Sequence, residues 1–278
     1  MKKLLHRIEI NMNMIVSNVF KIWGVFFPLY WGVVFSGYFG TVFGNVLNCI
    51  LFVIAAAAFI VFISIFLTLR IKERTIFHSS TNKALEVQFG DIFSNEAEIK
   101  VIPVNRCFDT IVNNTVISNQ SLHGQLIKQH LNHLSYEEFC EKLKRGLRDQ
   151  VGEEIPNKIN GNQIRYPVGT IVEIEDGGVI YYLLGMTKMD EVCQVSCTTE
   201  DYFCAIGSLM RYYDAHGQGK TIAIPNLGAG FSRLNQTEQI LLNSLTSTIH
   251  MHQNCMRGNV KIIVHESQKS IVSITDLR

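Results

Sequence analysis

Two long apolar stretches near the amino terminus constrain this chain more than any other feature. They run from Ile22 to Phe43 and from Val46 to Leu69, and neither contains a charged residue. At about 1.5 Å of rise per helical residue, either stretch would span roughly 33–36 Å, enough to cross the hydrocarbon core of a bilayer. The alternative is a hydrophobic hairpin buried in a soluble protein, although a core helix rarely runs this long without polar residues. We therefore predict a membrane anchor over residues 1–74, with transmembrane helices at about 22–43 and 46–69.

Basic residues lie before the first apolar stretch and after the second, but not between them. Four precede the first stretch and three follow the second, whereas the turn between the stretches carries no charge. These residues are Lys2, Lys3, Arg7, Lys21, Arg70, Lys72 and Arg74. By the positive-inside rule, the amino terminus and the domain after the anchor both face the cytosol.

The remainder of the chain has the composition of a cytosolic domain that does not bind nucleic acid. After residue 74 there are 18 Lys and Arg against 22 Asp and Glu, a net charge of −4, with no long basic run. The seven cysteines lack the spacing of a disulfide framework, so we expect free thiols. Cys193 and Cys197 could join His216 or His252 at a metal, but no second spaced pair exists, and we predict no metal site.

Strand and helix patterns alternate through this body. We predict a linker over residues 75–83 and one α/β domain over 84–278, with a mixed, largely parallel sheet between helices. The predicted strands are Leu85–Phe89, Ile99–Val104, Thr170–Ile174, Val179–Leu184, Thr221–Ile224 and Val260–Val264.

Three amphipathic helices accompany the strands. A capping box at Ser135–Glu138 starts one, and its apolar positions recur every four residues through Phe139, Leu143, Leu147 and Val151. A second runs from about Thr199 to Ala215 with Gly217 behind it. A third runs from Gln236 to Gln253, with Asn235 as its cap and Glu238 in its first turn.

The strand and loop from Lys220 to Ser232 form the segment that most clearly indicates a ligand-binding site. An apolar strand ends at Pro225, and the loop Asn226–Gly230 contains two glycines. In an open α/β sheet, ligands settle at such strand ends, and glycines let backbone N–H groups approach a phosphate. A plain connection that uses glycines only for turn geometry is the alternative.

Three features taken together resemble the macro domain, the ADP-ribose-binding fold, over roughly residues 84–275. They are the strand that ends in Gly90–Asp91–Ile92, the Val104–Asn105 pair after the next strand, and the Pro225–Phe231 loop. The resemblance implies that Asp91 accepts a hydrogen bond from the adenine amino group and that the backbone of Ile92 meets the base. It implies that the late loop surrounds the phosphates, with Phe231 against a ribose. The ligand contacts so implied are Asp91, Ile92, Asn105, Ser121, Leu122, His123, Gly124, Pro225, Asn226, Leu227, Gly228, Ala229, Gly230 and Phe231.

The same resemblance argues against catalysis. The familiar macro-domain hydrolases place an asparagine before a Gly-rich loop and an acid shortly after it. Asn105 could serve as the asparagine, but Gln125–Lys128 supply no acid. His123 could act as a general base, since an unperturbed imidazole titrates near pH 6.5. We predict no catalytic residue and no cofactor, with a membrane-tethered ADP-ribosyl hydrolase as the alternative.

The whole architecture is similar to the membrane-anchored macro-domain effectors of type II Thoeris anti-phage defence. That similarity implies a bacterial inner-membrane protein that binds an ADP-ribose-derived nucleotide, such as a histidine conjugate made by a partner TIR-domain enzyme. It also implies homo-oligomers that disrupt the lipid bilayer. Contacts to the conjugated group could come from Asn160–Gly169 or Met186–Cys197. A structural membrane protein whose macro-like fold has lost its ligand is a further alternative.

Overall fold

The computed structural model of the chain describes residues 2–35, 46–228, 234 and 236–277. These residues form two compact units. The helical unit comprises the chain up to Lys72 together with Lys269–Leu277, and the sheet unit comprises Glu73–Gln268.

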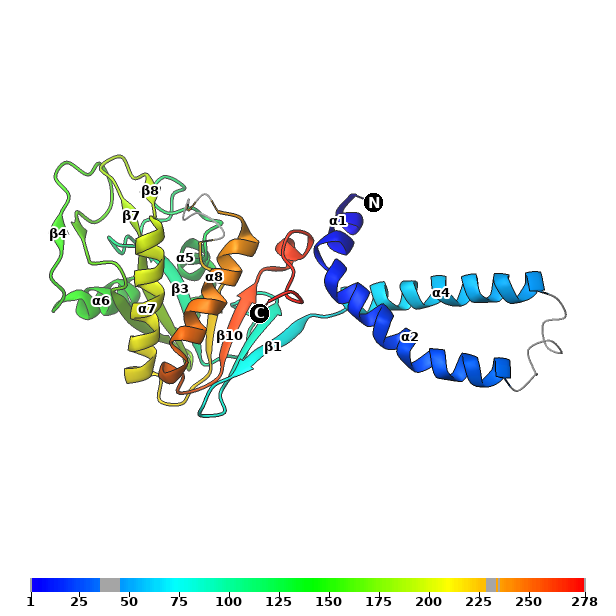
Figure 1. The fold of residues 1–278 in the computed structure, drawn as a ribbon. Coiled ribbons are helices and arrows are strands. Elements are labelled where there is room, and N and C mark those ends of the chain that lie inside the picture. The colour runs from blue at the N-terminus through cyan, green and yellow to red at the C-terminus, as the bar shows by residue number, and fades with distance from the viewer. Residues whose placement is uncertain (1, 36–45, 229–233, 235, 278) are drawn as a thin grey trace. The chain divides into compact units, whose positions relative to one another are not determined.

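The helical unit contains α1 (Lys2–Ile10), α2 (Met12–Phe35) and α4 (Val46–Leu69) (Figure 1). Asn11 separates α1 from α2, and the chain bends there by 70°. The Asn11 side chain donates to the Arg7 carbonyl at 2.7 Å, and an asparagine that bonds to nearby backbone in this way competes with helix propagation. The second helix therefore begins at Met12, upstream of the Ile22 predicted from hydropathy.

Polar side chains join α2 to α4 at one end. Asn18 Nδ2 donates to Thr68 Oγ1 at 3.1 Å, while Thr68 Oγ1 donates to the Ser64 carbonyl at 2.8 Å. Within the described residues, one helical stretch, Leu51–Leu69, is long and apolar enough to cross a bilayer, or two if the bent pair α1 and α2 counts as one. Residues 36–43 of the first predicted span lie outside the described residues.

The sheet unit is built on a mixed sheet in the order β1-β2-β10-β9-β3-β7-β6. The five central strands run parallel, whereas β1 and β6 pair antiparallel at the two edges. The bounds are β1 (Glu73–His78), β2 (Ala84–Phe89), β3 (Ile99–Asn105), β6 (Ile171–Asp176), β7 (Val179–Met189), β9 (Ile222–Pro225) and β10 (Val260–Val264). The short β8 (Val195–Ser196) pairs with β7, and β4 (Glu153–Glu154) pairs with β5 (Ile164–Arg165). The predicted α/β fold with a largely parallel sheet is confirmed, but residues 75–78, predicted as linker, belong to β1.

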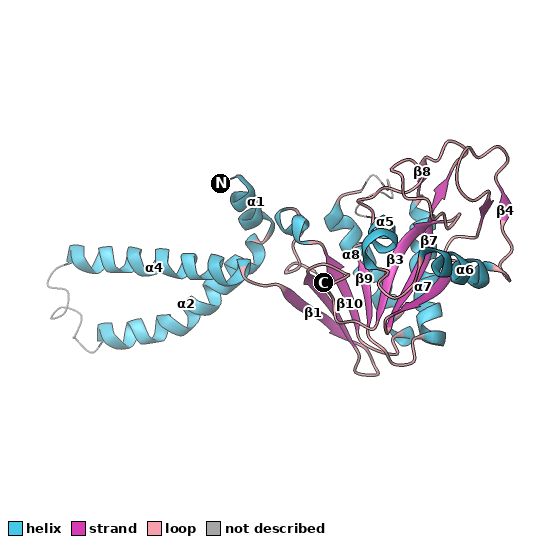
Figure 2. Cartoon of the chain, turned by 180° about the vertical axis from the view of Figure 1, so that it is seen from behind, coloured by secondary structure: helices cyan, strands magenta, loops and turns pink. Residues whose placement is uncertain are grey.

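Helices cover both faces of this sheet. On one face lie α5 (Leu122–Gln125) and α6 (Tyr136–Leu147), and on the other α7 (Thr199–His216) and α8 (Glu238–Met251) (Figures 1 and 2). A π-helical turn, η1 (Leu126–His130), follows α5, and two short 3-10 turns, η2 (Gln253–Cys255) and η3 (Glu266–Ser270), flank β10.

Two predicted helix boundaries need correction. The N-cap of α8 is Thr237, whose hydroxyl accepts from Ile240 N, and not Asn235, which lies outside the described residues. Helix α6 ends at Leu147, so Val151 lies beyond its apolar stripe and is 86% exposed. The capping box at Ser135 and Glu138 is present as predicted.

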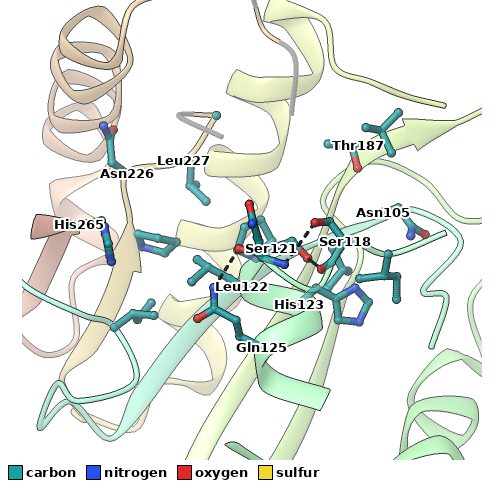
Figure 3. Close-up of a pocket in the computed structure, with 18 of the residues that line it drawn as sticks. Asn105, Ser118, Ser121, Leu122, His123, Gln125, Thr187, Asn226, Leu227 and His265 are labelled. Carbon is teal, nitrogen blue, oxygen red and sulfur yellow. Dashed lines mark hydrogen bonds between the residues drawn. The ribbon is translucent and has the colours of Figure 1, made fainter. Parts of the chain in front are cut away.

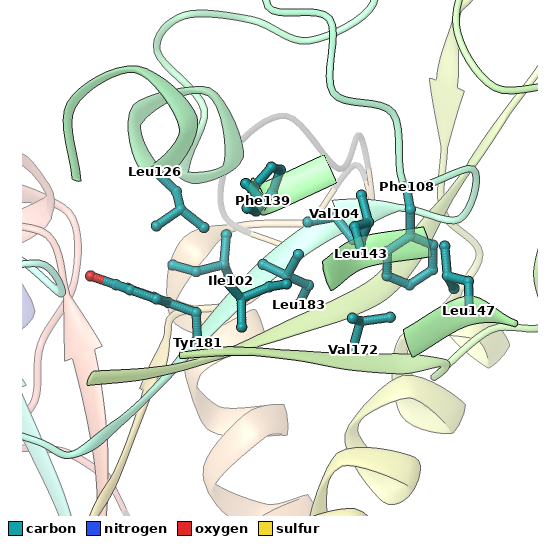
Figure 4. Close-up of a cluster of buried hydrophobic side chains, with 11 residues drawn as sticks. Ile102, Val104, Phe108, Leu126, Phe139, Leu143, Leu147, Val172, Tyr181 and Leu183 are labelled. Atoms are coloured by element: carbon teal, nitrogen blue, oxygen red, sulfur yellow. The ribbon is translucent and has the colours of Figure 1, made fainter. Parts of the chain in front are cut away.

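A cluster of buried hydrophobic side chains lies between α6 and the sheet (Figure 4). Phe139, Leu143 and Leu147 of α6 pack in one cluster with side chains of β3, β6 and β7. Val104 and Phe108, at the carboxyl end of β3, belong to the same cluster. Burial of these side chains therefore fixes the strand end from which the site is built.

Candidate ligand-binding site

A cavity of about 690 Å³ opens at the carboxyl ends of the parallel strands (Figure 3). Asp91 follows β2, Asn105 ends β3, Thr187 lies in β7, Pro225 ends β9 and His265 follows β10, and all five line the cavity. This is the edge of an open α/β sheet at which ligands bind. The volume is within the range of about 300–1,000 Å³ that is usual for small-molecule sites.

The structure brings together most of the residues predicted to bind ligand. Ten of them line the cavity: Asp91, Ile92, Asn105, Ser121, Leu122, His123, Pro225, Asn226, Leu227 and Gly228. Gly124 is buried in α5 next to that wall. Ala229, Gly230 and Phe231 lie outside the described residues.

Asp91 closes one end of the cavity. Its two carboxylate oxygens accept from Phe93 N and Ser94 Oγ, each at 3.1 Å, so the acid forms an Asx turn directly after β2. Each oxygen of an ionised carboxylate has a second acceptor position, so the exposed Asp91 can still accept from a ligand amino group. Beside Asp91, Ile92 is buried against Ala97, Ala223 and Ile263, which anchors the turn to the sheet.

The loop after β9 forms the middle of the cavity. Asn226 N donates to the Ile263 carbonyl at 3.0 Å, and Asn226 Nδ2 donates to the Glu238 carbonyl at 3.2 Å, so the loop is tied to β10 and to the start of α8. Gly228 has φ +81°, and a Cβ there would lie 2.7 Å from Leu234 Cδ1. Only glycine therefore fits this turn without strain.

Helix α5 forms the facing wall. Ser121 caps it by accepting from Gly124 N at 3.1 Å, and the Ser121 hydroxyl donates to the Ser118 carbonyl at 2.8 Å (Figure 3). A Cβ on Gly124 would collide with that same carbonyl oxygen. Gly124 therefore lets the wall approach the preceding loop, which is a packing role and not a direct contact with the cavity.

His123 is a neutral polar group in this wall. Its side chain is only 4% exposed, and its Nε2 has no hydrogen-bond partner among the described residues. Burial lowers the pKa of His123 from 6.5 to about 3, because the charged imidazolium would lose its hydration. At neutral pH the ring is uncharged, so it offers no positive charge to a phosphate.

Asn105 lies at a shift in the register between β3 and β7. Its Oδ1 accepts from Cys107 N at 3.0 Å and from Asp109 N at 3.4 Å. Burial raises the pKa of the Asp109 carboxyl, and this is the largest effect on it. The Asn105 side chain also hydrogen-bonds the Asp109 carboxylate, which lowers the same pKa. The Asn105 amide is thus engaged in holding the turn that follows β3.

A buried ion pair supports the same turn. Lys158 Nζ lies 2.8 Å from Asp109 Oδ2, and neither side chain is exposed. Asn162 completes the network, because its N donates to Asp109 Oδ1 and its Nδ2 donates to the carbonyls of Cys107 and Phe108. The sequence pattern did not reveal this network, since Asp109 follows β3 whereas Lys158 and Asn162 lie in the loop between β4 and β5.

Three further walls lie outside the residues predicted to contact the ADP-ribose part of the ligand. They are the loop Asn114–Ser118, the hairpin segment Val192–Val195 and residues His265, Ser267 and Gln268 after β10. Val192–Val195 falls in one of the two segments left open for a conjugated group, whereas none of Asn160–Gly169 lines the cavity. Over the described part of the chain, no cluster of His, Cys, Asp and Glu is arranged to hold a metal, including the neighbourhood of Cys193 and Cys197.

The cavity wall is nearly uncharged. Asp91 is the one charged side chain among the described residues that line it, and no lysine or arginine joins it. A pyrophosphate bound here would therefore depend on backbone N–H groups, as in anion-binding nests, and not on basic side chains.

The sequence model described as "Thoeris protein ThsA, Macro domain" matches residues 85–265, more than half of the chain. The chain belongs to the Thoeris ThsA macro-domain family. The predicted macro-domain resemblance is therefore confirmed. The matched range starts in β2 and ends just after β10, so it contains every residue of the cavity wall except Ser267 and Gln268.

Individual relatives are distant. The Thoeris protein ThsA of Bacillus amyloliquefaciens (strain Y2) is 26% identical over 151 residues, which cover 54% of this chain and 50% of that protein. The chain thus spans about half the length of this relative. Among solved structures, an Oceanobacillus iheyensis macrodomain with MES bound has a TM-score of 0.47 at 11% identity, covering 71% of this chain and 92% of that one. Thermosipho africanus DarTG in complex with ADP-ribose has a TM-score of 0.43 at 12% identity, covering 69% and 44%.

Proposed function

We propose that this protein is a membrane-anchored receptor for an ADP-ribose-derived nucleotide and acts as an effector in anti-phage defence. The observation that carries the proposal is the cavity at the carboxyl ends of the parallel strands, with Asp91 at one end and the Pro225–Gly228 loop across its middle, in a chain of the ThsA macro-domain family. The adenine amino group would donate to Asp91, and the pyrophosphate would meet the glycine-bearing loop.

The ligand is a nucleotide conjugate, such as histidine-linked ADP-ribose produced by a TIR-domain enzyme. The neutral walls at Asn114–Ser118 and Val192–Val195 offer polar and apolar contacts but no opposing charge. These walls would accept the conjugated group beyond the second ribose. The protein takes no resident cofactor.

The anchor is the helical unit. Leu51–Leu69 is long and apolar enough to span the bacterial inner membrane, and the bent α1 and α2 pair would supply the second crossing. The charge pattern puts the amino terminus and the sheet unit in the cytosol. Ligand binding would drive copies of the chain to assemble and to disrupt the bilayer.

Two observations favour a receptor over a hydrolase. The pKa of His123, lowered to about 3 by burial, makes it a weak general base at neutral pH. The Asn105 side chain is engaged by the Cys107 and Asp109 backbone, which leaves it poorly placed to orient a water.

Dye release from lipid vesicles tests the proposal. The full chain is reconstituted into dye-loaded vesicles, histidine-linked ADP-ribose is added, and the nucleotide is recovered for mass spectrometry. We expect dye release with the conjugate recovered intact, and weaker release from an Asp91→Asn chain than from the exposed matched control Glu96→Gln. Conversion of the conjugate to free ADP-ribose would support the hydrolase instead, and an absence of release despite binding would remove the membrane-disruption part of the proposal.

A further inference from the structure

We propose that the carboxyl-terminal segment Lys269–Leu277, here called the strap, couples the ligand cavity to the helix junction at Asn11. The inference rests on the proposed receptor function and adds a route by which occupancy of the cavity reaches the helical unit. The residues that carry it are His265, Ser267 and Gln268 on the cavity wall and Ser273 and Thr275 in the strap.

One end of this route is the cavity. His265, Ser267 and Gln268 line the cavity directly after β10. A short turn organises them, because Gln268 N donates to the His265 carbonyl at 2.8 Å and the His265 ring lies 2.8 Å from Ser267 Oγ. A ligand that contacts this wall therefore acts on the residues from which the strap departs.

The other end is Asn11. Ser273 Oγ and Thr275 Oγ1 both donate to Asn11 Oδ1 at 2.8 Å, and all three residues are buried. The two hydroxyls lie 3.0 Å apart, so three oxygens share the two hydroxyl hydrogens. Such a buried cluster holds only while every partner stays in place, because an unpaired buried oxygen is costly.

The strap is packed and not a loose tail. Val272 and Ile274 are 1% exposed and Leu277 is 3% exposed, while Ile271 and Asp276 face solvent. Few residues separate Gln268 from Ser273, and the turn η3 (Glu266–Ser270) bridges them. The strap therefore leaves the cavity wall through the η3 turn and is buried from Val272 to Thr275.

Asn11 is the position at which such a displacement would matter. It separates α1 from α2 at the 70° bend, and its Nδ2 holds the Arg7 carbonyl. Arg7 Nη2 in turn donates to the carbonyl of Leu69 at the end of α4. The Asn11 side chain thus joins the strap to the end of α1, and the Arg7 side chain joins α1 to the end of α4. A shift of the strap would act on the bend through these two side chains.

Hydrogen exchange of the full chain in lipid nanodiscs tests the coupling without any ligand. A Ser273→Ala/Thr275→Val chain loses both donors to Asn11, whereas Asp276→Asn alters an exposed strap residue and serves as the matched control. We expect the Gln268 amide, at the cavity wall, to exchange roughly tenfold faster in the double variant and unchanged in the control, because two buried hydrogen bonds are lost. Faster exchange confined to residues 271–277 would overturn the coupling.

A second arm adds ADP-ribose as the probe. Protection of the Asn226 amide, which donates to Ile263, reports binding itself. In the native chain, ADP-ribose should also change the exchange rates of the Asn11 and Ile15 amides. In the double variant these two rates should not change, while the Asn226 amide should still be protected. Persistence of the change at Asn11 in the double variant would overturn the strap as the route. No protection of Asn226 would count against the receptor function, and the ligand-free arm would still decide the coupling.

Discussion

The Lys158 ammonium lies 2.8 Å from the Asp109 carboxylate, and both side chains are fully buried. This pair links the loop that contains Lys158 to the turn after β3, which carries Asn105 into the cavity wall. A buried pair of this kind adds little net stability when both partners are present, but loss of one partner leaves an unpaired buried charge. The geometry of the cavity therefore depends on the Asp109–Lys158 pair, although neither residue lines the cavity.

Removal of the ammonium should destabilise the sheet unit strongly. We expect Lys158→Met to lower the free energy of unfolding by about 3–5 kcal/mol, because Asp109 stays buried without its partner. Denaturant unfolding of the full chain in detergent measures this loss. Lys144→Met, at an exposed position, should have little effect, and Asp109→Asn/Lys158→Met should recover much of the loss. Equal stability of Lys158→Met and the native chain would contradict the assigned pair.

Acid should destabilise the fold through His123. Burial lowers its pKa to about 3 in the folded state, whereas the unfolded imidazole titrates near 6.5. Both states are neutral well above pH 6.5, so His123 gives no pH dependence there. As the pH falls through 6.5, only the unfolded state gains a proton, and stability falls. From pH 7.5 to pH 5 the loss is about 2 kcal/mol, because the slope approaches roughly 1.4 kcal/mol per pH unit below pH 6.5.

Unfolding at pH 7.5 and pH 5 with two matched variants isolates this effect. His123→Gln should lose less stability on acidification than the native chain, whereas His216→Gln, at an exposed position, should match the native chain. Identical acid sensitivity in the native and His123→Gln chains would contradict the lowered pKa of His123 in the folded state.

A methyl group at Gly124 should distort the α5 wall. Its Cβ would collide with the Ser118 carbonyl oxygen, and backbone cannot move aside as a flexible side chain can. We expect Gly124→Ala to cost about 1–3 kcal/mol of ligand-free stability, in the manner of overpacking. Gly90→Ala is the matched control, because a Cβ there meets nothing within 4 Å. Equal stability of the two variants would contradict the close approach of α5 to Ser118.

A charge in α4 should interfere with membrane insertion. Ile54 is exposed in α4, and an arginine at the centre of a spanning helix costs about 2.5–3.5 kcal/mol on insertion scales. We expect Ile54→Arg to shift a large share of the protein from the alkali-resistant membrane fraction to the soluble or aggregated fraction. Phe203→Arg, on the exposed side of α7, should leave the fractionation unchanged. Native protein recovered in the soluble fraction would contradict the anchor.

Local sequence signals predicted most of the elements. The bounds of β10 and α4 could be read from hydropathy and β-branched content, and the capping box at Ser135 fixed the start of α6. The strand order could not be read, because β10 lies between β2 and β9 through pairings between residues distant in sequence. The start of α2 at Met12 was missed because a hydrogen bond of the Asn11 side chain marks the boundary between α1 and α2. The prediction relied on hydropathy, which does not report such a bond.

The candidate site was predictable where its residues follow strands. Asp91 and the Pro225–Gly228 loop come directly after β-rich runs, so their meeting at one sheet edge followed from the α/β pattern. The walls at Asn114–Ser118 and Val192–Val195 belong to irregular loops with no periodicity, and the Asp109–Lys158 pair joins two such loops. Only the folded chain brings these residues together.

Calorimetry of ADP-ribose binding to the full chain tests the central claim most directly. The full chain is needed because a truncation at residue 75 would cut β1 and deletion of the strap would alter the helical unit. We predict one ADP-ribose per chain, with affinity reduced about 10- to 100-fold by Asp91→Asn, as for a lost hydrogen bond to a charged group. Glu96→Gln should bind as the native chain does. No binding heat with the native chain, or equal affinity in Asp91→Asn, would contradict the assignment of this cavity as the nucleotide receptor.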